Sequence, residues 1–345
     1  MKVIFPLILS LITLKALALD CNLPAPWDAT TTLQFGHEDH RSANSRVLQV
    51  GIDCMELNPI INLYSEMLVF LPTTWPRPSG LILNVIDKAS NAYVNGNRVN
   101  LPLHFINEDK EKIDDQKILA IWAHEFAHVF LNTFMQQEIP EMIAFNEIYY
   151  PLLSAKANRA VALENIAYYQ VLGNSSVKEY FAAQKSYSQM NEEIRQFEKQ
   201  IDQLENSRML KVINRISKPY HEFFADLVTV LYFNNPRAIA ESLKIDYDPA
   251  KDKKVSYRDF SYIGNSIAEW EGNLDDLKDS HHTMAASRYE IGKFLTALNL
   301  EKKHQLLEKI AHLIIAEIKR QVENDEADSP LELNRSFIQK FHQQK

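Results

Sequence analysis

The chain has 345 residues, 46% of them hydrophobic, and a formal net charge of −8. This length is sufficient for one sizeable core with additions to it. The acidic balance, with no basic cluster to oppose it, argues against a nucleic-acid-binding surface, and the low glycine content of eight residues is typical of a mostly helical protein.

The N-terminus has the pattern of a signal peptide. Lys2 precedes an apolar run over residues 3–14, and Ala16-Leu17-Ala18 forms an A-x-A cleavage site. The run is shorter than a membrane span and Lys15 interrupts it, although an uncleaved anchor is an alternative. No later segment reaches the roughly 18 apolar residues of a transmembrane helix. We therefore expect residues 1–18 to direct export to the periplasm or the exterior, and the mature chain to have no transmembrane segment.

The sequence contains two cysteines, Cys21 and Cys54. In an oxidising compartment they could form a disulfide that ties the mature N-terminus to the start of the core. Two free thiols are the alternative. A lipoprotein cysteine at Cys21 is disfavoured, because Asp20 occupies the position where a lipobox has a small residue.

Residues 19–135 are expected to form the first part of the core, built from a helix, a small sheet and a second helix. Asn-Pro at the start of residues 58–70 indicates the beginning of the first helix, and the prolines of 72–78 indicate a loop. Strands are expected over 81–86 and in a hairpin around Asn95-Gly96, which is a strong turn signal.

The second helix contains the most specific motif, H-E-x-x-H. His124 and His128 lie four residues apart and share a helical face, so both imidazoles can reach one metal ion. Zinc binds histidine nitrogen and, in catalytic sites, keeps one position open for water, whose proton Glu125 can accept. The residues around the motif, 118–123 and 129–131, are apolar on every side of the helix, which predicts burial. Buried polar groups need partners. The alternative to a metal is a pair of core histidines that form hydrogen bonds with other protein groups.

Another apolar helix, expected over residues 220–231, contains two acids four residues apart, Glu222 and Asp226. Glu222 would complete a His, His, Glu zinc site, the donor set of the gluzincins. Asp226 would accept a hydrogen bond from the free ring nitrogen of a ligating histidine. His221 is the alternative ligand, but its side chain points about 100° away from Glu222, so the two should not bind one metal together.

Between the two motifs, residues 136–216 are expected to form a helical insertion. Two helices, over 140–171 and 177–214, should be separated by the stop and cap signal Gly173-Asn174-Ser175-Ser176. In the second helix, apolar residues alternate four and three apart, as in a short coiled-coil seam, at Met190, Ile194, Phe197, Ile201 and Leu204. We favour a helical pair packed on the core, and an arm that binds a partner is the alternative.

The remaining chain should complete the core and then extend beyond it. Residues 217–299 form the second part of the predicted core. Residues 300–345 are expected as a C-terminal helix near 300–323, an acidic stretch over 323–326 and a polar tail.

These motifs resemble those of a metallopeptidase family that includes the CAAX prenyl proteases, the HtpX-like heat-shock proteases and their soluble periplasmic relatives. His124-Glu125-Phe126-Ala127-His128 is similar to the family's H-E-x-x-H. Glu222-Phe223-Phe224-Ala225-Asp226 is similar to its E-x-x-A-D, and His282 with Arg288 to its H-P-x-x-x-x-R. The motifs occur in the family's order.

The resemblance implies further roles. His282 would stabilise the oxyanion of the reaction, and Arg288 would hold that segment against the core. The match is partial here, because Thr283 stands where the family has proline and the preceding His281 leaves the choice of histidine open. Upstream, Asn91-Ala92-Tyr93-Val94 resembles a family strand, next to which an edge strand holds extended peptide by backbone pairing.

The sequence therefore predicts an α+β, mostly helical protein with a zincin-like core, a small β-sheet and a long helical insertion. Its expected activity is that of a zinc-dependent endopeptidase acting on a protein or peptide. His124, His128 and Glu222 would bind Zn²⁺, and Glu125 would be the general base and later the acid. One alternative is a catalytically idle, chaperone-like or interaction protein that uses the insertion, which the intact Glu125 argues against. The other is a zinc aminopeptidase, for which the sequence offers no identifiable acidic site for a free amino terminus.

Overall fold

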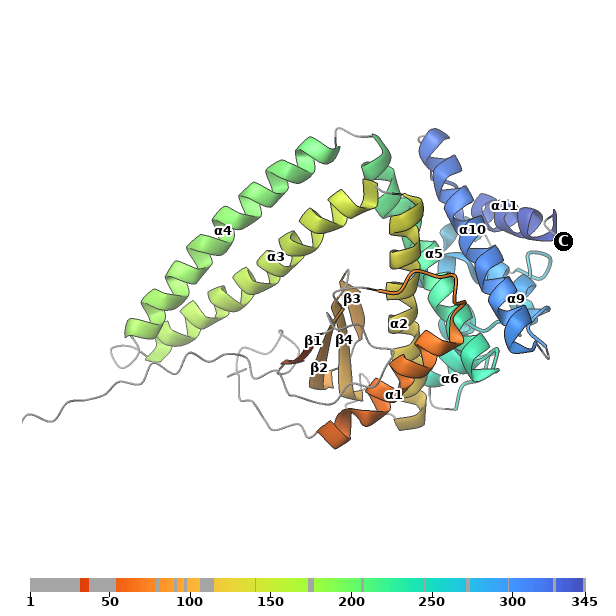
Figure 1. The fold of residues 1–345 in the computed structure, drawn as a ribbon, viewed down its shortest axis with the longest axis horizontal. Helices are drawn as coiled ribbons and strands as arrows, with labels where there is room; N and C mark the ends of the chain where they lie inside the picture. The colour runs from red at the N-terminus through yellow and green to blue at the C-terminus, as the bar shows by residue number, and fades with distance from the viewer. Residues whose placement is uncertain are drawn as a thin grey trace, which may run out of the picture.

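A computed structural model of the chain describes residues 32–36, 54–78, 81–89, 92–95, 98–105, 115–139, 141–172, 177–205, 208–244, 246–270, 274–296, 298–324 and 327–343. They form a mostly helical α+β fold with one small sheet, which confirms the predicted class (Figure 1). The predicted signal peptide, residues 1–18, lies outside the described residues. So does Cys21, and with it the predicted disulfide to Cys54.

The described strands form a four-stranded mixed sheet in the order β1-β2-β4-β3. β1 (Thr32–Gly36), β2 (Ile82–Ala89) and β4 (Arg98–Phe105) run parallel, and β3 (Tyr93–Asn95) pairs antiparallel with β4. The sheet is larger than the sequence predicts, because β1 was not expected. β1 becomes a strand by pairing with β2, about 50 residues away, and local patterns do not reveal such long-range partners.

The sheet lies against the helix that carries the first motif, α2 (Asp115–Glu138). Trp122 of α2 donates a hydrogen bond from its indole nitrogen to the carbonyl oxygen of Pro102 in β4, over 3.0 Å. Leu83 and Val85 of β2 are buried, and in β4 four consecutive residues, 99–102, are buried, so this part of β4 is covered on both faces.

The centre of the core is the contact between α2 and α5 (Arg208–Phe233), which lie side by side (Figure 1). α1 (Cys54–Phe70) and α6 (Ala238–Leu243) pack against α2. α1 begins four residues earlier than predicted, so that Pro59 lies inside the helix. The earlier start adds Met, Glu and Leu, which are strong helix formers.

The insertion forms a long helical hairpin, α3 (Glu141–Leu172) and α4 (Val177–Glu205), which projects away from the core (Figure 1). Lys156 of α3 pairs with Glu198 of α4 over 2.8 Å. The predicted seam is confirmed in part. Ile194 and Ile201 of the seam form a buried cluster with Leu152 and Ala155 of α3, and Phe197 packs against this cluster.

The second insertion helix ends at Glu205, and the prediction that it runs to residue 214 was wrong. Residues 208–216 instead belong to α5, the helix that carries Glu222. The sequence analysis gave residues 208–214 to the insertion and expected the helix of Glu222 over residues 220–231. α5 begins at Arg208 and continues through Pro219.

The C-terminal part wraps the core with short helices and then two longer ones. α7 (Lys253–Ser256), two 3₁₀ helices (Ile263–Asn265 and Leu274–Asp276), α8 (Ser280–Thr283) and α9 (Ala285–Gly292) precede α10 (Leu300–Asn324) and α11 (Pro330–Gln343). The predicted polar tail was wrong, because most of it forms α11. Its apolar residues lie four apart and are buried, at Leu333, Phe337 and Phe341.

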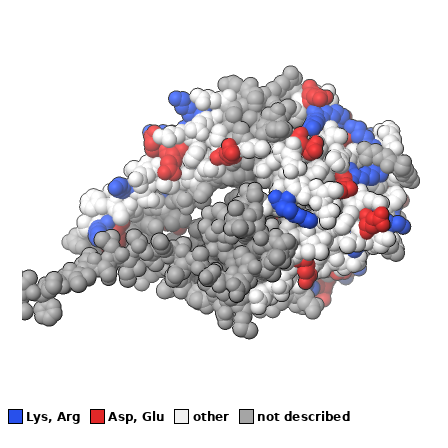
Figure 2. All heavy atoms as spheres, viewed as in Figure 1, with Lys and Arg blue, Asp and Glu red and all other residues white. Residues whose placement is uncertain are grey.

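Within the described residues, no helix combines the length and the apolar character needed to cross a membrane. Figure 2 shows acidic and basic side chains interspersed over the described part of the visible face.

Candidate metal centre

The two predicted motifs meet where α2 and α5 cross the core. His124, Glu125 and His128 lie in the middle of α2, and Glu222 and Asp226 lie in α5. The site is enclosed, because His124 is 5% exposed, Glu125 7% and Asp226 0%. Polar groups buried this deeply need partners, and each of the partners described here is another member of the site.

The three predicted ligands form a group that could hold a metal ion, since their ligand atoms all lie within 4.8 Å of one another. Nε2 of His124 lies 3.0 Å from Nε2 of His128 and 3.3 Å from Oε2 of Glu222. Nε2 of His128 lies 3.8 Å from Oε1 of Glu222. Atoms bound at about 2.0–2.1 Å to a tetrahedral zinc ion are about 3.3–3.4 Å apart. The observed separations bracket that value, so the donor set fits a tetrahedral ion.

Asp226 accepts hydrogen bonds from three side chains of the site. Its Oδ1 lies 2.9 Å from Nδ1 of His124, which is the contact predicted from the sequence. Arg258 donates from Nε and Nη2 over 3.1 and 2.5 Å, and Arg288 donates from Nε over 2.8 Å. The bond to Nδ1 leaves Nε2 of His124 facing the other ligands, as a metal-binding histidine requires.

Arg258 is a central residue that the sequence analysis missed. Its Nη2 lies 3.1 Å from Nδ1 and 3.3 Å from Nε2 of His124, and 4.0 Å from Oε2 of Glu222. One atom cannot lie in line with both ring lone pairs, so at most one of the two ring contacts is a well-aligned hydrogen bond. The available signal was Asp226, since a carboxylate in an apolar helix calls for a buried counter-charge. Nothing local to Arg258 identifies it as that counter-charge.

The charges of the centre keep its two inner carboxylates ionised. Burial opposes the ionisation of Asp226, but Arg258 and Arg288 hold its pKa well below the usual range. Burial also opposes the ionisation of Glu222, yet His128 and His124 lower its pKa. Ionised carboxylates are the form that binds or orients metal ligands, so both acids are in the state that a metal centre needs.

The two histidines differ in their affinity for protons. Burial holds the pKa of His128 well below its usual value. Burial and the nearby Arg258 also act to lower the pKa of His124, but hydrogen bonds with Asp226 and Glu222 outweigh them and raise it to about 9. A proton and a metal ion compete for Nε2, so metal binding would release the proton of His124.

Glu125 has the properties of a general base. It lies on α2 one residue after His124, and its side chain is buried. Burial raises the pKa of Glu125 to about 7, and the negative charges of Glu222 and Asp226 add to this while His124 and Arg258 oppose it. A carboxyl group with a pKa near 7 can both accept and return a proton at neutral pH.

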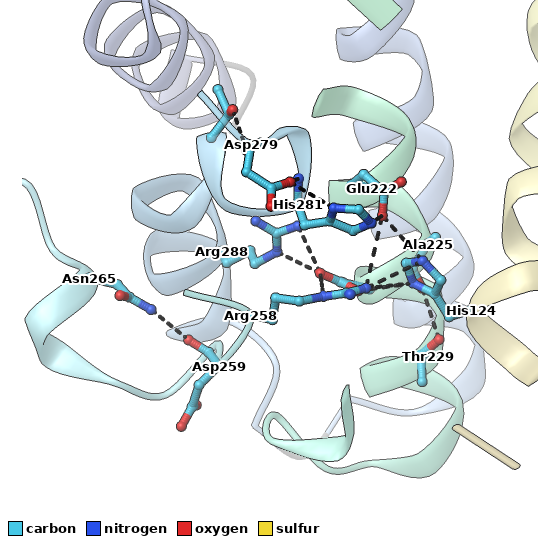
Figure 3. A network of polar contacts seen from close by, with 12 residues as sticks. His124, Glu222, Ala225, Thr229, Arg258, Asp259, Asn265, Asp279, His281 and Arg288 are labelled. Carbon is cyan, nitrogen blue, oxygen red and sulfur yellow. Dashed lines mark hydrogen bonds and ion pairs between the residues drawn. The ribbon is translucent and has the colours of Figure 1, made fainter. Parts of the chain in front are cut away.

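The two histidines of the partial third motif point to different places. Nε2 of His281 lies 3.4 Å from Oε2 of Glu222, and its Nδ1 lies 2.7 Å from Asp279 (Figure 3). His282 instead lies against Tyr257, with ring centroids 5.2 Å apart. The sequence prediction chose His282 and left His281 open. The geometry favours His281, because it is the one that reaches a ligand of the centre.

Arg288 and His221 complete the predicted set. Arg288 is fully buried and binds Asp226, so α9 is held against α5 in the way expected for this residue. His221 lies beside His128, with ring centroids 5.9 Å apart, but the group that could hold a metal contains Glu222 and not His221.

We found no family model, no curated protein and no solved structure that matches the chain. The centre nevertheless has a restricted chemistry. Two imidazoles and one carboxylate as protein ligands leave a fourth position for water, which is the arrangement of hydrolytic zinc sites. Glu125 adds a proton acceptor, so the arrangement suits the attack of water on a polar bond.

Proposed function

We propose that the protein is an exported, zinc-dependent endopeptidase of the gluzincin type. The observation that supports this most directly is the convergence of His124, His128 and Glu222, whose ligand atoms lie within 4.8 Å of one another next to a buried Glu125. Two nitrogen donors and one carboxylate suit zinc better than magnesium or calcium, which prefer oxygen ligands alone. The resemblance to the CAAX prenyl protease and HtpX-like family, and the signal-peptide pattern of residues 1–18, support the same proposal.

The residues of the centre divide the work of peptide hydrolysis. When bound, zinc supplies a Lewis acid that activates water and the scissile carbonyl group. Glu125 accepts the proton that water loses as it attacks the carbonyl carbon, and later donates it to the departing amine. His281 donates a hydrogen bond from Nε2 to the developing oxyanion. Asp226 holds the proton on Nδ1 of His124 and so keeps Nε2 directed at the metal position.

The edge strand β3 is the proposed track for the substrate. Within the described sheet, β3 pairs with β4 on one side and has no strand on the other. It also contacts α2, the helix of Glu125, and Tyr93 is 37% exposed on it. An extended peptide can add to such an edge through main-chain hydrogen bonds, which do not depend on its sequence. This mode suits an enzyme that cleaves unfolded protein segments.

A zinc-containing binding protein without catalysis is the second candidate, and the α3–α4 hairpin favours it. The far end of the hairpin exposes several apolar side chains, with Val171 87%, Phe181 61% and Val177 44% exposed. Groups of exposed apolar side chains are typical of surfaces that contact a partner. In this second proposal zinc stabilises the core and the hairpin performs the function.

Zinc content and proteolysis, measured on the same preparation, separate the two candidates. An endopeptidase should contain about one zinc ion per chain, cleave an unfolded protein such as casein, lose activity to a chelator and regain it with added Zn²⁺. The Glu125→Gln variant serves as the control, because it should keep zinc and lose most of the cleavage. Zinc-loaded wild-type protein that leaves casein intact would favour the binding protein. Equal cleavage by wild type and Glu125→Gln would indicate a contaminating protease.

A further inference from the structure

We infer that a basic cleft beside the metal centre binds a carboxylate group of the substrate. The cleft has a volume of about 660 Å³, and its lining includes Arg215, Lys218, Lys278, Asp279, Ser280 and Thr283. The inference rests on the proposed peptidase function and adds the chemistry of its substrates. They would be peptides with an acidic side chain, or a free C-terminal carboxylate, close to the bond that is cleaved.

Both walls of the cleft lead to the metal centre. Arg215, Lys218 and Glu222 are spaced by three and four residues on α5 and therefore share one helical face. Lys218 precedes Glu222 by four residues, or about 6 Å along the helix axis. On the other wall, Asp279 binds His281, whose Nε2 lies 3.4 Å from Glu222. An extended peptide advances about 3.3 Å per residue, so the cleft lies within two or three residues of the centre.

The charges in the cleft are available to a ligand. Arg215, Lys218 and Lys278 are exposed, and none of them forms an ion pair within the described part of the chain. Asp279 is an acid in the lining, but its carboxylate accepts hydrogen bonds from the backbone nitrogen and Nδ1 of His281, over 3.0 and 2.7 Å. Three cations therefore face the cleft with one acid that is already engaged.

This excess of positive charge runs against the chain as a whole, whose formal net charge is −8. A basic cleft in an acidic protein concentrates anions at that position and repels them elsewhere. The anion that a peptide can bring to this place is a carboxylate, from Asp, Glu or the C-terminus. The attraction of this carboxylate to the cations should steer such peptides toward the metal centre and determine which of their bonds lies at the centre.

Matched peptides test the inference and distinguish the two sources of the carboxylate. Glu is placed in turn at each of three positions on either side of the cleaved bond. Each such peptide is paired with one that has Gln at the same position, and each is made with a free and with an amidated C-terminus. We expect kcat/KM at low salt to be about tenfold higher for the acidic member of one such pair. The preference should weaken as salt is added, because the cations are exposed. A preference for Glu over Gln assigns a side-chain carboxylate, and a preference for the free acid assigns the C-terminus.

Variants of the lining provide the second part of the test. The double variant Arg215→Gln with Lys218→Gln should reduce the preference to about twofold or less, and Lys278→Gln alone should reduce it partly. These side chains are exposed, so the variants should fold, and zinc content reports on the centre. Lys199→Gln, which removes an exposed cation of α4, is the matched control and should keep the full preference. Equal kcat/KM for every peptide pair, or an equal loss in the control, overturns the inference.

Binding measured without turnover keeps this test apart from the proposed function. In Glu125→Gln, the anisotropy of labelled peptides gives Kd for the acidic and neutral members of each pair. If wild-type protein cleaves nothing but binds the acidic peptide more tightly through Arg215 and Lys218, the peptidase proposal fails and the cleft remains a carboxylate site. If wild-type protein cleaves all peptides equally and Glu125→Gln binds them equally, the cleft inference fails and the peptidase proposal remains.

Discussion

The carboxylate of Asp226 lies 2.9 Å from Nδ1 of His124 and, through the same oxygen, accepts a hydrogen bond from Nη2 of Arg258. One buried acid thus orients a proposed metal ligand and neutralises a buried cation. The second oxygen binds Arg288, which holds α9 against α5. The orientation of the ligand and the stability of the surrounding fold therefore depend on the same residue.

Replacing Asp226 should therefore impair both metal affinity and stability. In Asp226→Asn, the Arg258 and Arg288 guanidinium groups lose their shared negative partner inside the core. We expect the free energy of unfolding to fall by about 3–5 kcal/mol, the usual effect of leaving a buried charge without its partner. Zinc affinity should fall by about 10- to 100-fold, because His124 loses the group that orients it. Denaturant unfolding and competitive zinc titration measure the two effects.

A surface ion pair provides the control for this prediction. Lys293 and Glu290 pair over 2.6 Å at the surface. Lys293→Gln should change the free energy of unfolding by less than about 1 kcal/mol, since exposed pairs contribute little. If Asp226→Asn were no more destabilising than Lys293→Gln, the buried cluster would not have the structural role assigned to it.

The role of Glu125 can be separated from metal binding. Glu125 is not one of the three residues that converge as ligands. Glu125→Gln should keep about one zinc ion per chain and lower kcat for peptide hydrolysis by about 10²- to 10⁴-fold, the range that a general base contributes. Metal analysis and a peptide assay on the same sample check both statements. Normal turnover in this variant would rule out the proposed mechanism.

The choice of the third ligand is tested by two neighbouring residues. Glu222 lies 3.3 Å from Nε2 of His124, whereas His221 lies beside His128 without joining the ligand group. Glu222→Ala should lose zinc, and His221→Ala should retain it, because three protein ligands are needed for tight binding. The measurement is zinc content after dialysis against a weak chelator. Retention in Glu222→Ala with loss in His221→Ala would show that the ligand was assigned to the wrong residue.

The two histidines after Asp279 should have unequal effects on catalysis. His281 reaches Glu222, so His281→Ala should lower kcat by about 10²- to 10³-fold if it donates to the oxyanion, with KM little changed. His282 packs on Tyr257, and His282→Ala should lower kcat by much less. Zinc content and unfolding midpoints of both variants exclude indirect effects. A larger loss in His282→Ala would return the role to the residue that the sequence resemblance suggested.

The sequence was sufficient to predict the residues whose chemistry is encoded locally. His124 with His128, and Glu222 with Asp226, lie four apart in apolar helices, and that spacing alone brings each pair to one face. Arg258 could not be found this way, because it reaches Asp226 from a turn 32 residues away that has no periodic pattern of its own. The cleft was missed for a similar reason, since its cations come from α5 and from the segment before α8.

Errors in the predicted fold have the same origin. β1 depends on pairing with a distant strand, and its five residues are too few to show a clear alternation. The predicted start of α5 was too late, because the helix continues upstream through Pro219, a residue that locally disfavours a helix, and packs on α2. Tertiary contacts thus determine the presence of β1 and the start of α5, for which the local sequence pattern is too short or points to another boundary.

The hairpin of α3 and α4 should affect access of large substrates more than it affects zinc binding. It leaves the core after α2 and returns at α5, the helix of Glu222, so its base lies near the centre and it could form a wall or lid. Arg159 and Asn191 face each other across the hairpin over 3.3 Å, which provides a place to shorten it. Joining residue 159 to residue 191 through a short glycine linker removes the exposed apolar end. The buried cluster of Leu152, Ala155, Ile194 and Ile201 remains, so the shortened protein should fold and keep zinc.

The measurements are zinc content and the rates of cleavage of a short peptide and of casein. If the hairpin controls access, the ratio of the two rates should change severalfold while zinc content stays constant. The matched control is the double variant Glu193→Gln with Lys199→Gln, which replaces exposed charges on the part of α4 that is retained. This variant should leave the ratio of the two rates unchanged. Unchanged rates for both substrates in the shortened protein would mean that the hairpin is not a lid. Its exposed Val171, Val177 and Phe181 would then be assigned to contact with another protein.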